Sequence, residues 1–400
     1  MNLLYNGKRI GPNWAFAFYF VMMFCCYTYT YIQLFAQLFI LAYVVGPIFI
    51  KGKLVLERQG LRNLVFYILW FGGFTLLLYL SKYWASSVYA GSKTMLSVFR
   101  IFAIGCAIFY YADSKEKALS LLQSFILGCF IMGAVAVITT GNAVGTTSFG
   151  RSIGQHRNQI GAVSAPLAVI CYFLNKSYCM RYGNIVSIFF MILTILTGSR
   201  SAILQIVFII VIYILFTETS ISKKIKNILA GCLLGIICVV LIQNIPYLYE
   251  IVWVRIENAI KTVLGIEIAD QSALGRSYYK TIAYMMFLER PLLGYGLDGF
   301  KCFVRDNPYI ISTTVLNAVY SHCNYAELAA NFGLVGLLIW YIPIFLQIKN
   351  VIGFRKTTPW SGCLFCVFVS MVFFDYSRIP WETHLVMYLF FIVILLIRFS

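Results

Sequence analysis

The sequence predicts an all-α, polytopic membrane protein with about 12 transmembrane helices. Apolar residues occupy 61% of its 400 positions and charged residues only 11%. Soluble proteins contain ~45–50% apolar and ~25% charged residues, so this chain cannot cover a water-facing surface. Its apolar runs are continuous rather than alternating, which favours helices over β-strands in lipid. The composition therefore excludes a soluble enzyme, a disordered chain and a small disulfide scaffold.

The apolar runs divide into twelve predicted spans, because a helix needs ~20 residues to cross a bilayer. Residues 14–50 carry no charged side chain and have room for two short spans, which we divide near residues 29–33. The remaining spans are predicted at residues 61–80, 95–111, 119–139, 159–174, 185–197, 202–216, 228–243, 334–347, 360–374 and 385–398.

The distribution of Lys and Arg predicts the orientation of these spans. With the N-terminus inside, seventeen of these residues fall in inner segments and seven in the short outer loops. Cytoplasmic loops are enriched in Lys and Arg, so we expect both termini to be cytoplasmic. Residues 244–333 then form one long extracytoplasmic loop with short helices, within a single integral membrane domain of residues 1–400. The basic inner loops explain part of the net charge of +17. The remaining excess predicts an anionic partner on the outer side, and we expect no nucleic acid partner.

Arg200 lies at the predicted outer side, in the short motif T-G-S-R-S at residues 197–201. One interpretation is that its side chain only extends to the membrane interface. The other is ligand binding, because charges at the membrane margin are usually functional. A planar guanidinium suits a phosphate diester or a pyrophosphate.

A second outer motif, F-G-R-S-I-G-Q-H-R-N at residues 149–158, contains Arg151, His156 and Arg157. It is either a flexible connector or a group of two cations and one titratable imidazole facing an anionic ligand.

The long loop contains two predicted helical stretches, one at residues 251–264 that lies along the membrane surface and one at residues 277–289, opened by Gly275-Arg276 and ended by Pro291. The string G-Y-G-L-D-G at residues 294–299 matches a dinucleotide fingerprint. We reject that interpretation because the string follows a helix and a proline rather than a strand. The glycines instead predict a tight turn.

His322 opens a motif, H-C-N-Y-A-E, where the long loop returns to the membrane. It is either packed as a polar interface residue or a general base near neutral pH. No other His or carboxylate lies at metal-ligand spacing, so we expect no metal and no cofactor. Cys302 and Cys323 lie in the same loop, where a disulfide is open to them if the loop is extracytoplasmic.

The order of these motifs resembles the O-antigen polymerase/ligase superfamily of bacterial envelope glycosyltransferases. The resemblance covers residues 142–336 and includes T-G-S-R-S, G-R, P-L-L-G-Y-G and S-H-C-N-Y followed by N-F-G-L-V-G. The His-Asn pair of the family is interrupted here by Cys323.

The resemblance implies transfer of a glycan from an undecaprenyl-diphosphate-linked oligosaccharide to an acceptor hydroxyl, outside the bacterial cytoplasmic membrane and without metal. His322 is the implied base, and Arg200 and Arg276 bind the donor pyrophosphate, with Arg151, Arg157 and Asn324 as further substrate-binding residues. The second-half motifs are more similar to the repeat-unit polymerases of O-antigen, capsule and exopolysaccharide than to the ligases. A flippase and a chain-length regulator of the same pathway are implied partners, besides membrane lipid.

Three alternatives stay open. An O-antigen ligase would move the finished glycan to lipid A-core. A flippase or other transporter would also have about twelve spans, although it should carry midmembrane charges in repeated halves. A membrane scaffold would leave Arg200 and Arg276 dispensable.

Overall fold

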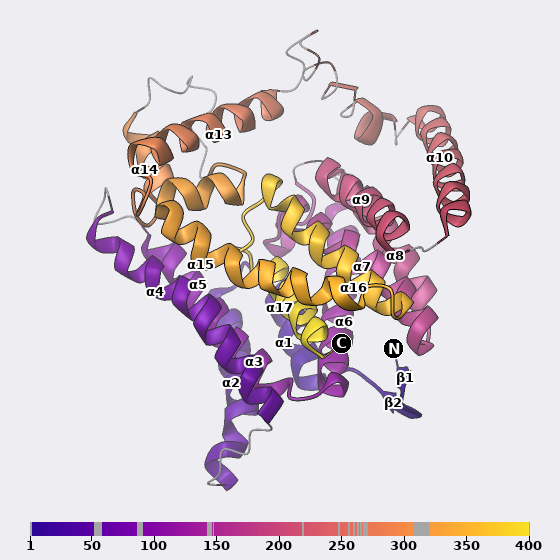
Figure 1. Ribbon diagram of the computed structural model, residues 1–400, viewed down its shortest axis with the longest axis horizontal. Coiled ribbons are helices and arrows are strands. Elements are labelled where there is room, and N and C mark those ends of the chain that lie inside the picture. Colours follow the sequence, from indigo (N-terminus) through magenta and orange to yellow (C-terminus); the bar gives the residue numbers. More distant parts are fainter. Residues whose placement is uncertain are drawn as a thin grey trace.

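The computed structural model describes residues 2–51, 58–85, 91–141, 146, 148–217, 220–246, 249–254, 257, 258, 261, 264, 266, 271–307 and 320–399. This part of the chain is almost entirely helical, apart from the antiparallel pair β1 (Leu3–Tyr5) and β2 (Lys8–Ile10). The all-α prediction is therefore confirmed. Figure 1 shows a bundle of helices with α10 at one edge and both chain ends in the lower half of the view.

The bundle consists of α1 (Trp14–Cys25), α2 (Thr30–Lys51), α3 (Arg58–Tyr67) with its continuation η1 (Ile68–Gly72), α4 (Gly73–Leu80) and η2 (Ser81–Tyr83), α5 (Ser92–Tyr111), α6 (Lys115–Thr140), α7 (Arg157–Tyr178), α8 (Gly183–Leu196), α9 (Arg200–Thr217), α10 (Ile221–Asn244), α15 (Asn324–Phe354), α16 (Pro359–Phe373) and α17 (His384–Arg398). Shorter elements lie in the connections: η4 (Arg151–Ile153), η5 (Tyr249–Trp253), α13 (Gln271–Glu289), α14 (Gly299–Asp306) and η8 (Phe374–Ser377).

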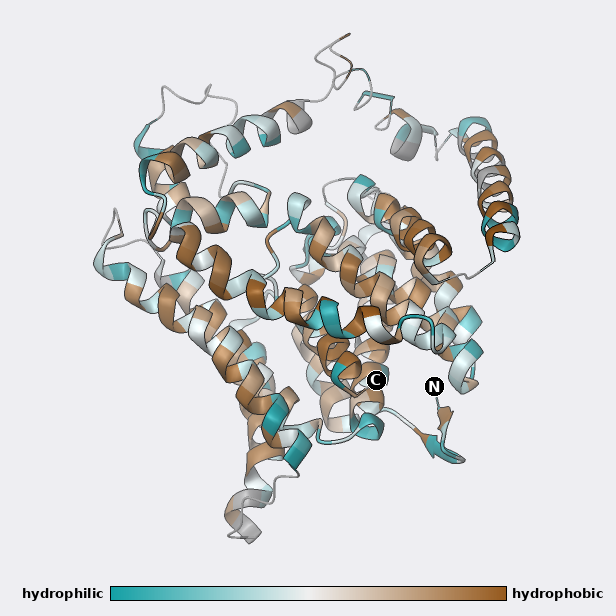
Figure 2. Cartoon of the chain, in the orientation of Figure 1, coloured by the Kyte–Doolittle hydropathy of each residue, from teal (hydrophilic) through white to brown (hydrophobic). Residues whose placement is uncertain are grey.

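Each of the twelve predicted spans coincides with helical structure. Within the described residues, 8 helices are long and apolar enough to cross a membrane, and α1, α8 and α17 are shorter apolar helices. Figure 2 shows the brown, hydrophobic faces along these helices and teal, hydrophilic residues near many of their ends. The chain is thus a polytopic membrane protein, and the count of twelve stays a prediction. The predicted surface helix at residues 251–264 includes positions outside the described residues.

Local sequence explains where several helices begin. Asn13 caps α1 by accepting hydrogen bonds from the backbone N–H groups of Ala15 and Phe16. Ser114 caps α6 in the same way, and Thr358 caps α16, which has a proline at its first position. Side-chain oxygens at these positions satisfy N–H groups that a helix start leaves without partners.

The most buried helix is α17, in the centre of Figure 1. Its residues from His384 to Ile397 are all buried, and it packs against α5, α6, α7, α15 and α16. A helix that is apolar on all sides belongs in the interior of a bundle. The N-terminal end of α17 therefore emerges among the starts of its neighbours, where the candidate site lies.

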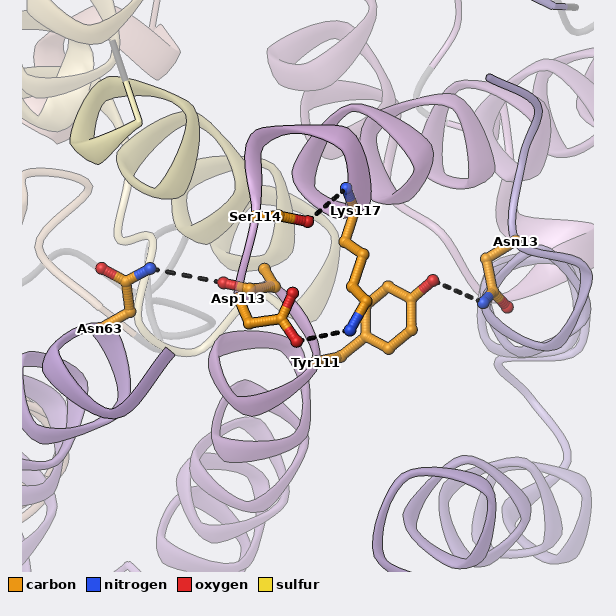
Figure 3. Close-up of polar contacts among 7 residues, drawn as sticks. Asn13, Asn63, Tyr111, Asp113, Ser114 and Lys117 are labelled. Carbon is orange, nitrogen blue, oxygen red and sulfur yellow. Dashed lines mark hydrogen bonds and ion pairs between the residues drawn. The ribbon is translucent and has the colours of Figure 1, made fainter. Parts of the chain in front are cut away.

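The opposite end of the bundle carries the connection between α5 and α6, and we call it the α5–α6 end. Its polar side chains pair with one another, as Figure 3 shows: Asn13 donates to the Tyr111 hydroxyl at 2.8 Å, and Lys117 pairs with Asp113. The chain termini lie at this end, because the backbone N–H of Arg181 donates to the Asn2 carbonyl and Arg398 donates to Asn63. The common position of the two ends agrees with an even number of spans.

Helix α15 is interrupted at Gly333, whose φ of 60° and ψ of -155° are non-helical. The backbone N–H groups of Leu334 and Val335 donate instead to the carbonyls of Pro291 and Leu292. A Cβ at Gly333 would lie 2.4 Å from the Leu292 carbonyl carbon, so only glycine allows this close approach. The break separates a first segment of α15, residues 324–332, from the longer segment that coincides with the predicted span at 334–347.

The glycine-rich string at residues 294–299 forms a turn packed on the first segment of α15. Gly294 and Gly296 have positive φ values of 62° and 83°, and the Gly296 N–H donates to the Asn331 carbonyl at 2.7 Å. A Cβ at Gly294 would lie 2.5 Å from the Asn331 carbonyl carbon. The prediction of a tight turn is confirmed.

Candidate functional site

A cavity of about 300 Å³ lies at the end of the bundle opposite the α5–α6 end. Three segments far apart in the sequence form its walls: the start of α7, the loop before α15, and the connection from α16 into α17. A volume of this size is at the lower limit of small-molecule sites, which span ~300–1,000 Å³. The lining residues are His156, Asn158, Gln159, Ala162, Tyr320, His322, Ser377, Arg378, Ile379, Glu382, Thr383 and Val386.

His156 forms one wall and also begins α7. Its Nδ1 accepts from the Asn158 N–H at 3.2 Å, and the Gln159 side chain accepts from the His156 N–H at 3.3 Å, which completes a capping box. The preceding loop turns through Gly150 and Gly154, both with positive φ. Gln155 anchors this loop by donating to the Phe24 carbonyl. The loop is therefore an ordered support for His156 and not a flexible connector.

His322 lies on a second wall, in a sharp turn with a φ of 60°, which a non-glycine residue seldom adopts. The turn is held by a hydrogen bond of 2.9 Å from the Ser321 hydroxyl to the Cys323 carbonyl. The imidazole lies beside the Tyr320 ring, with 4.1 Å between the ring centroids. Backbone strain of this kind persists when surrounding contacts hold it, and it concentrates at functional sites.

Glu327 is buried, and its carboxyl helps to hold the turn at His322 in place. One oxygen of its carboxyl accepts from the Ser321 N–H at 2.7 Å, and the other accepts from Asn331 at 3.1 Å. Asn331 in turn accepts from the Phe300 N–H at 2.7 Å. His322 precedes the helix that carries Glu327. The hydrogen bond from the Ser321 N–H to the Glu327 carboxyl joins the turn at His322 to this helix. Glu327 and Asn331 therefore support the turn that carries His322.

Asn324 is fully buried and does not line the cavity. Its side chain donates to Tyr341 at 2.9 Å and to Asp375 at 3.1 Å. Its backbone N–H donates to the carbonyl of Arg378 at 3.1 Å. The predicted substrate contact is therefore replaced by a positioning role, in which Asn324 joins the start of α15 to the third wall.

Arg378 lies on that third wall and was not among the predicted site residues. Its guanidinium donates to the Gln205 side chain of α9 at 2.8 Å and to the Ala162 carbonyl of α7 at 3.4 Å. Burial lowers the pKa of this guanidinium to about 10, and Asp375 opposes the shift, so the side chain stays cationic. The polar motif D-Y-S-R at residues 375–378, between two apolar spans, was the available sequence signal.

Further cations act on the two histidines of the cavity. Burial, followed by Arg276, His156 and Lys280, lowers the pKa of His322 to about 4. Burial, followed by Arg157, Arg151 and Arg276, lowers the pKa of His156. Four cations therefore act electrostatically on the histidines that line the cavity. Arg276 and Lys280 lie on α13, Arg151 lies on η4, and Arg157 is the first residue of α7.

Arg200 begins α9 directly after the turn at Gly198, which has a φ of 59°. Arg200 does not line the cavity. Its turn packs closely on α7, since a Cβ at Gly161 would lie 3.1 Å from the Ser199 Cβ. The structure thus brings Arg151, Arg157 and Arg276 within electrostatic reach of the histidines of one cavity, and Arg200 is not among the residues that line it.

Glu382 is the second lining residue that sequence reasoning missed. The only signal was its position just before the last apolar run. Within the described residues no group of three or more His, Cys, Asp and Glu side chains is arranged to hold a metal ion. Cys302 and Cys323 are both buried and free, so the disulfide considered from sequence does not form.

These features define a polytopic membrane protein with a cationic, histidine-containing cavity at one end of its helices. A family model described as O-antigen ligase matches residues 185–341, from α8 into the second segment of α15. The match confirms the resemblance to the O-antigen polymerase/ligase superfamily and indicates a glycosyltransferase-like function of the O-antigen ligase/polymerase type. It contains Arg200, Arg276 and His322, and it ends before Arg378 and Glu382. No curated protein matches the chain.

Proposed function

We propose that this protein is a polymerase that joins undecaprenyl-diphosphate-linked oligosaccharide repeat units into a surface polysaccharide. The observation that supports this most directly is the cavity, where His322 meets a group of cations. A lipid diphosphate needs fixed positive charge, and an attacking sugar hydroxyl needs a base. The cavity brings the two requirements together.

In the proposed reaction, a hydroxyl of the acceptor glycan attacks the anomeric carbon of the donor glycan. A new glycosidic C–O bond forms, and the bond between the anomeric carbon and the diphosphate oxygen breaks. The hydroxyl proton passes to the neutral imidazole of His322, and the diphosphate leaves with the electron pair. A single displacement of this kind inverts the anomeric configuration and needs neither metal nor cofactor.

The cations have a separate task in this reaction. Arg276 and Lys280, together with Arg151 and Arg157, which act on His156 from near the cavity, stabilise the negative charge that grows on the leaving diphosphate. Arg200 belongs to the same proposal through the family motif that carries it, T-G-S-R-S, whose turn packs on α7. Burial, together with Arg276 and Lys280, keeps His322 neutral before the donor binds, because each disfavours a positive charge on the imidazole.

The proposed location is the extracytoplasmic face of the bacterial cytoplasmic membrane, with both termini cytoplasmic. This orientation places the cavity on the side where the loop of residues 244–333 lies. A flippase and a chain-length regulator are the proposed partners, because one would deliver the lipid-linked units and the other would set the length of the product.

The test uses a deletion strain that carries the wild-type protein, His322→Ala or the matched control Lys117→Ala, which alters the α5–α6 end. Lipid-linked and surface glycans are separated by size at equal protein amount. We expect single repeat units in the deletion and His322→Ala strains, and a ladder with wild type and Lys117→Ala. A full ladder from His322→Ala would overturn the assignment of the base.

A ligase is the second candidate, because the matching family is described as O-antigen ligase. In that case long chains would accumulate on undecaprenyl diphosphate in the deletion strain and would fail to reach their final acceptor. Unchanged glycan length and attachment would contradict both enzymes and favour transport of an anionic lipid.

A further inference from the structure

Charged and titratable groups of both kinds line the cavity, and Arg378 and Glu382 lie on the same wall, the connection that leads into α17. His156 and His322 face the cations of η4, α7 and α13 described above. Glu382, on the α17 side, is the only carboxylate among the described lining residues. The charges that act on it are chiefly negative: Glu327 and Asp298 reinforce the effect of burial in raising its pKa to about 8, and Lys301 opposes them.

Packing and hydrogen bonds fix the position of the backbone that carries Glu382 at the cavity. It lies between Trp381, which is fully buried in the core, and Thr383, which also lines the cavity. The Thr383 N–H donates to the Pro380 carbonyl at 2.8 Å, and the Met387 N–H donates to the Thr383 carbonyl at 3.0 Å. These bonds form a turn that leads into α17. The Glu382 side chain is therefore carried by a rigid element.

The Glu382 carboxyl has no hydrogen bond or ion pair to another described residue. A polar group that is largely removed from water gains from a hydrogen-bond partner. A diphosphate is a poorer partner, because the charges that act on Glu382 are chiefly negative and would repel it. Hydroxyl groups are suitable partners, since a carboxylate accepts their hydrogen bonds and a protonated carboxyl can also donate.

Neighbouring side chains on the cavity wall match the same ligand chemistry. Thr383 offers a hydroxyl, and Asn158 and Gln159 add amides across the cavity. The Tyr320 ring beside His322 offers an aromatic face. Hydroxyl, amide and aromatic groups together suit a neutral, polyhydroxylated molecule.

We propose that Glu382 binds hydroxyl groups of the acceptor glycan and so holds the attacking hydroxyl beside His322. This inference rests on the proposed function and deepens it, because it separates a donor side, formed by the cations, from an acceptor contact at Glu382, which lies on the same wall as Arg378. Glu382 is then a specificity-determining residue for the acceptor, and it takes no part in binding the diphosphate.

The test compares Glu382→Ala and Glu382→Gln with two references. Arg276→Ala alters the donor side, and Glu116→Gln is a matched control in the first turn of α6, at the α5–α6 end. Two quantities are measured: binding of undecaprenyl diphosphate without a glycan to the purified protein in nanodiscs, and chain elongation in the deletion strain at equal protein amount.

We expect both Glu382 variants to bind undecaprenyl diphosphate like wild type, whereas Arg276→Ala binds it roughly tenfold more weakly. Elongation should fall at least ~10-fold for Glu382→Ala, because the hydrogen bonds to the acceptor are lost, and less for Glu382→Gln, which keeps both an acceptor and a donor. Glu116→Gln should behave like wild type in both measurements.

Normal elongation by Glu382→Ala would overturn the acceptor assignment, and so would weakened binding of undecaprenyl diphosphate by either Glu382 variant. If the deletion and His322→Ala stop elongation but Glu382→Ala does not, only this inference fails. If the deletion leaves glycan length unchanged, the proposed function fails and the acceptor assignment fails with it.

Discussion

The two ends of the helical bundle use polar residues in different ways. At the α5–α6 end, Asn13, Asn63, Asp113 and Lys117 are each paired with a neighbour on another turn or helix. At the cavity end, His322 and Glu382 face an open volume, and other residues hold the backbone that carries them. Mutual pairing stabilises the fold, whereas convergence on a cavity leaves groups available to a ligand.

Residues of the single motif at positions 322–331 also differ in their burial and hydrogen bonding. His322 lines the cavity, and Asn324, Glu327 and Asn331, which follow it closely in the sequence, are buried and bonded to the protein. Proximity in the sequence therefore does not indicate a shared role. The burial and the partners of each side chain distinguish the residue that faces the cavity from those that support it.

The largest contrast between the two ends is expected from His322→Ala. Loss of a general base should reduce the elongation rate by ~10²–10⁴-fold. The measurement is the rate of chain growth in membranes at equal protein amount. A normal rate would show that the cavity end is no more functional than the α5–α6 end.

Arg276→Ala should have the next largest effect. Removal of one fixed cation from the leaving diphosphate is expected to slow elongation by ~10–100-fold, and Arg276→Lys should recover part of the loss because it keeps the charge without the planar fork. The measurement is the elongation rate of both variants. Equal rates for Arg276→Ala and wild type would remove Arg276 from the donor side.

Glu327→Ala should affect stability as well as activity. It leaves the buried N–H of Ser321 and the amide of Asn331 without their acceptor, at a cost of ~1–3 kcal/mol for each buried group. We expect a lower unfolding temperature in detergent and a reduced elongation rate, because the turn at His322 loses its support. Unchanged thermal stability with unchanged activity would contradict the positioning role.

The pH dependence should show the effect of the cations on His322. Since its pKa is lowered to about 4, the imidazole is neutral at pH 7 and becomes protonated only as the pH falls toward that value. A base must be neutral to accept a proton, so elongation should lose rate on the acidic side. Lys280→Ala removes a positive neighbour and should move this loss to higher pH. An unmoved pH profile for Lys280→Ala would contradict the electrostatic link.

Lys117→Ala should have the smallest effect. Lys117 is 44% exposed in its ion pair with Asp113, and exposed pairs contribute ~0–1 kcal/mol. We expect an unfolding temperature close to that of wild type and an unchanged glycan ladder. A large loss of elongation from this variant would break the distinction between the two ends.

Local sequence was sufficient to predict the helices, the tight turns and the return of the chain into the membrane. Continuous apolar runs must form helices in lipid because each backbone group has to be bonded within its own segment. The turns at Gly198 and Gly294 follow from the freedom of glycine at positive φ. His322 and the arginines were found because charged and titratable groups are rare in such a chain.

The assembly of the cavity was decided by tertiary packing. Gln159 lines it together with Tyr320 and Glu382, although long stretches of sequence separate the three. Their meeting depends on which helices surround α17, and hydropathy carries no information about helix order, since any apolar face can pack on any other. The same reason explains why the sequence did not show that Asn324 is buried away from the cavity or that Arg378 and Glu382 line it: their neighbours lie on helices that only the folded bundle brings together.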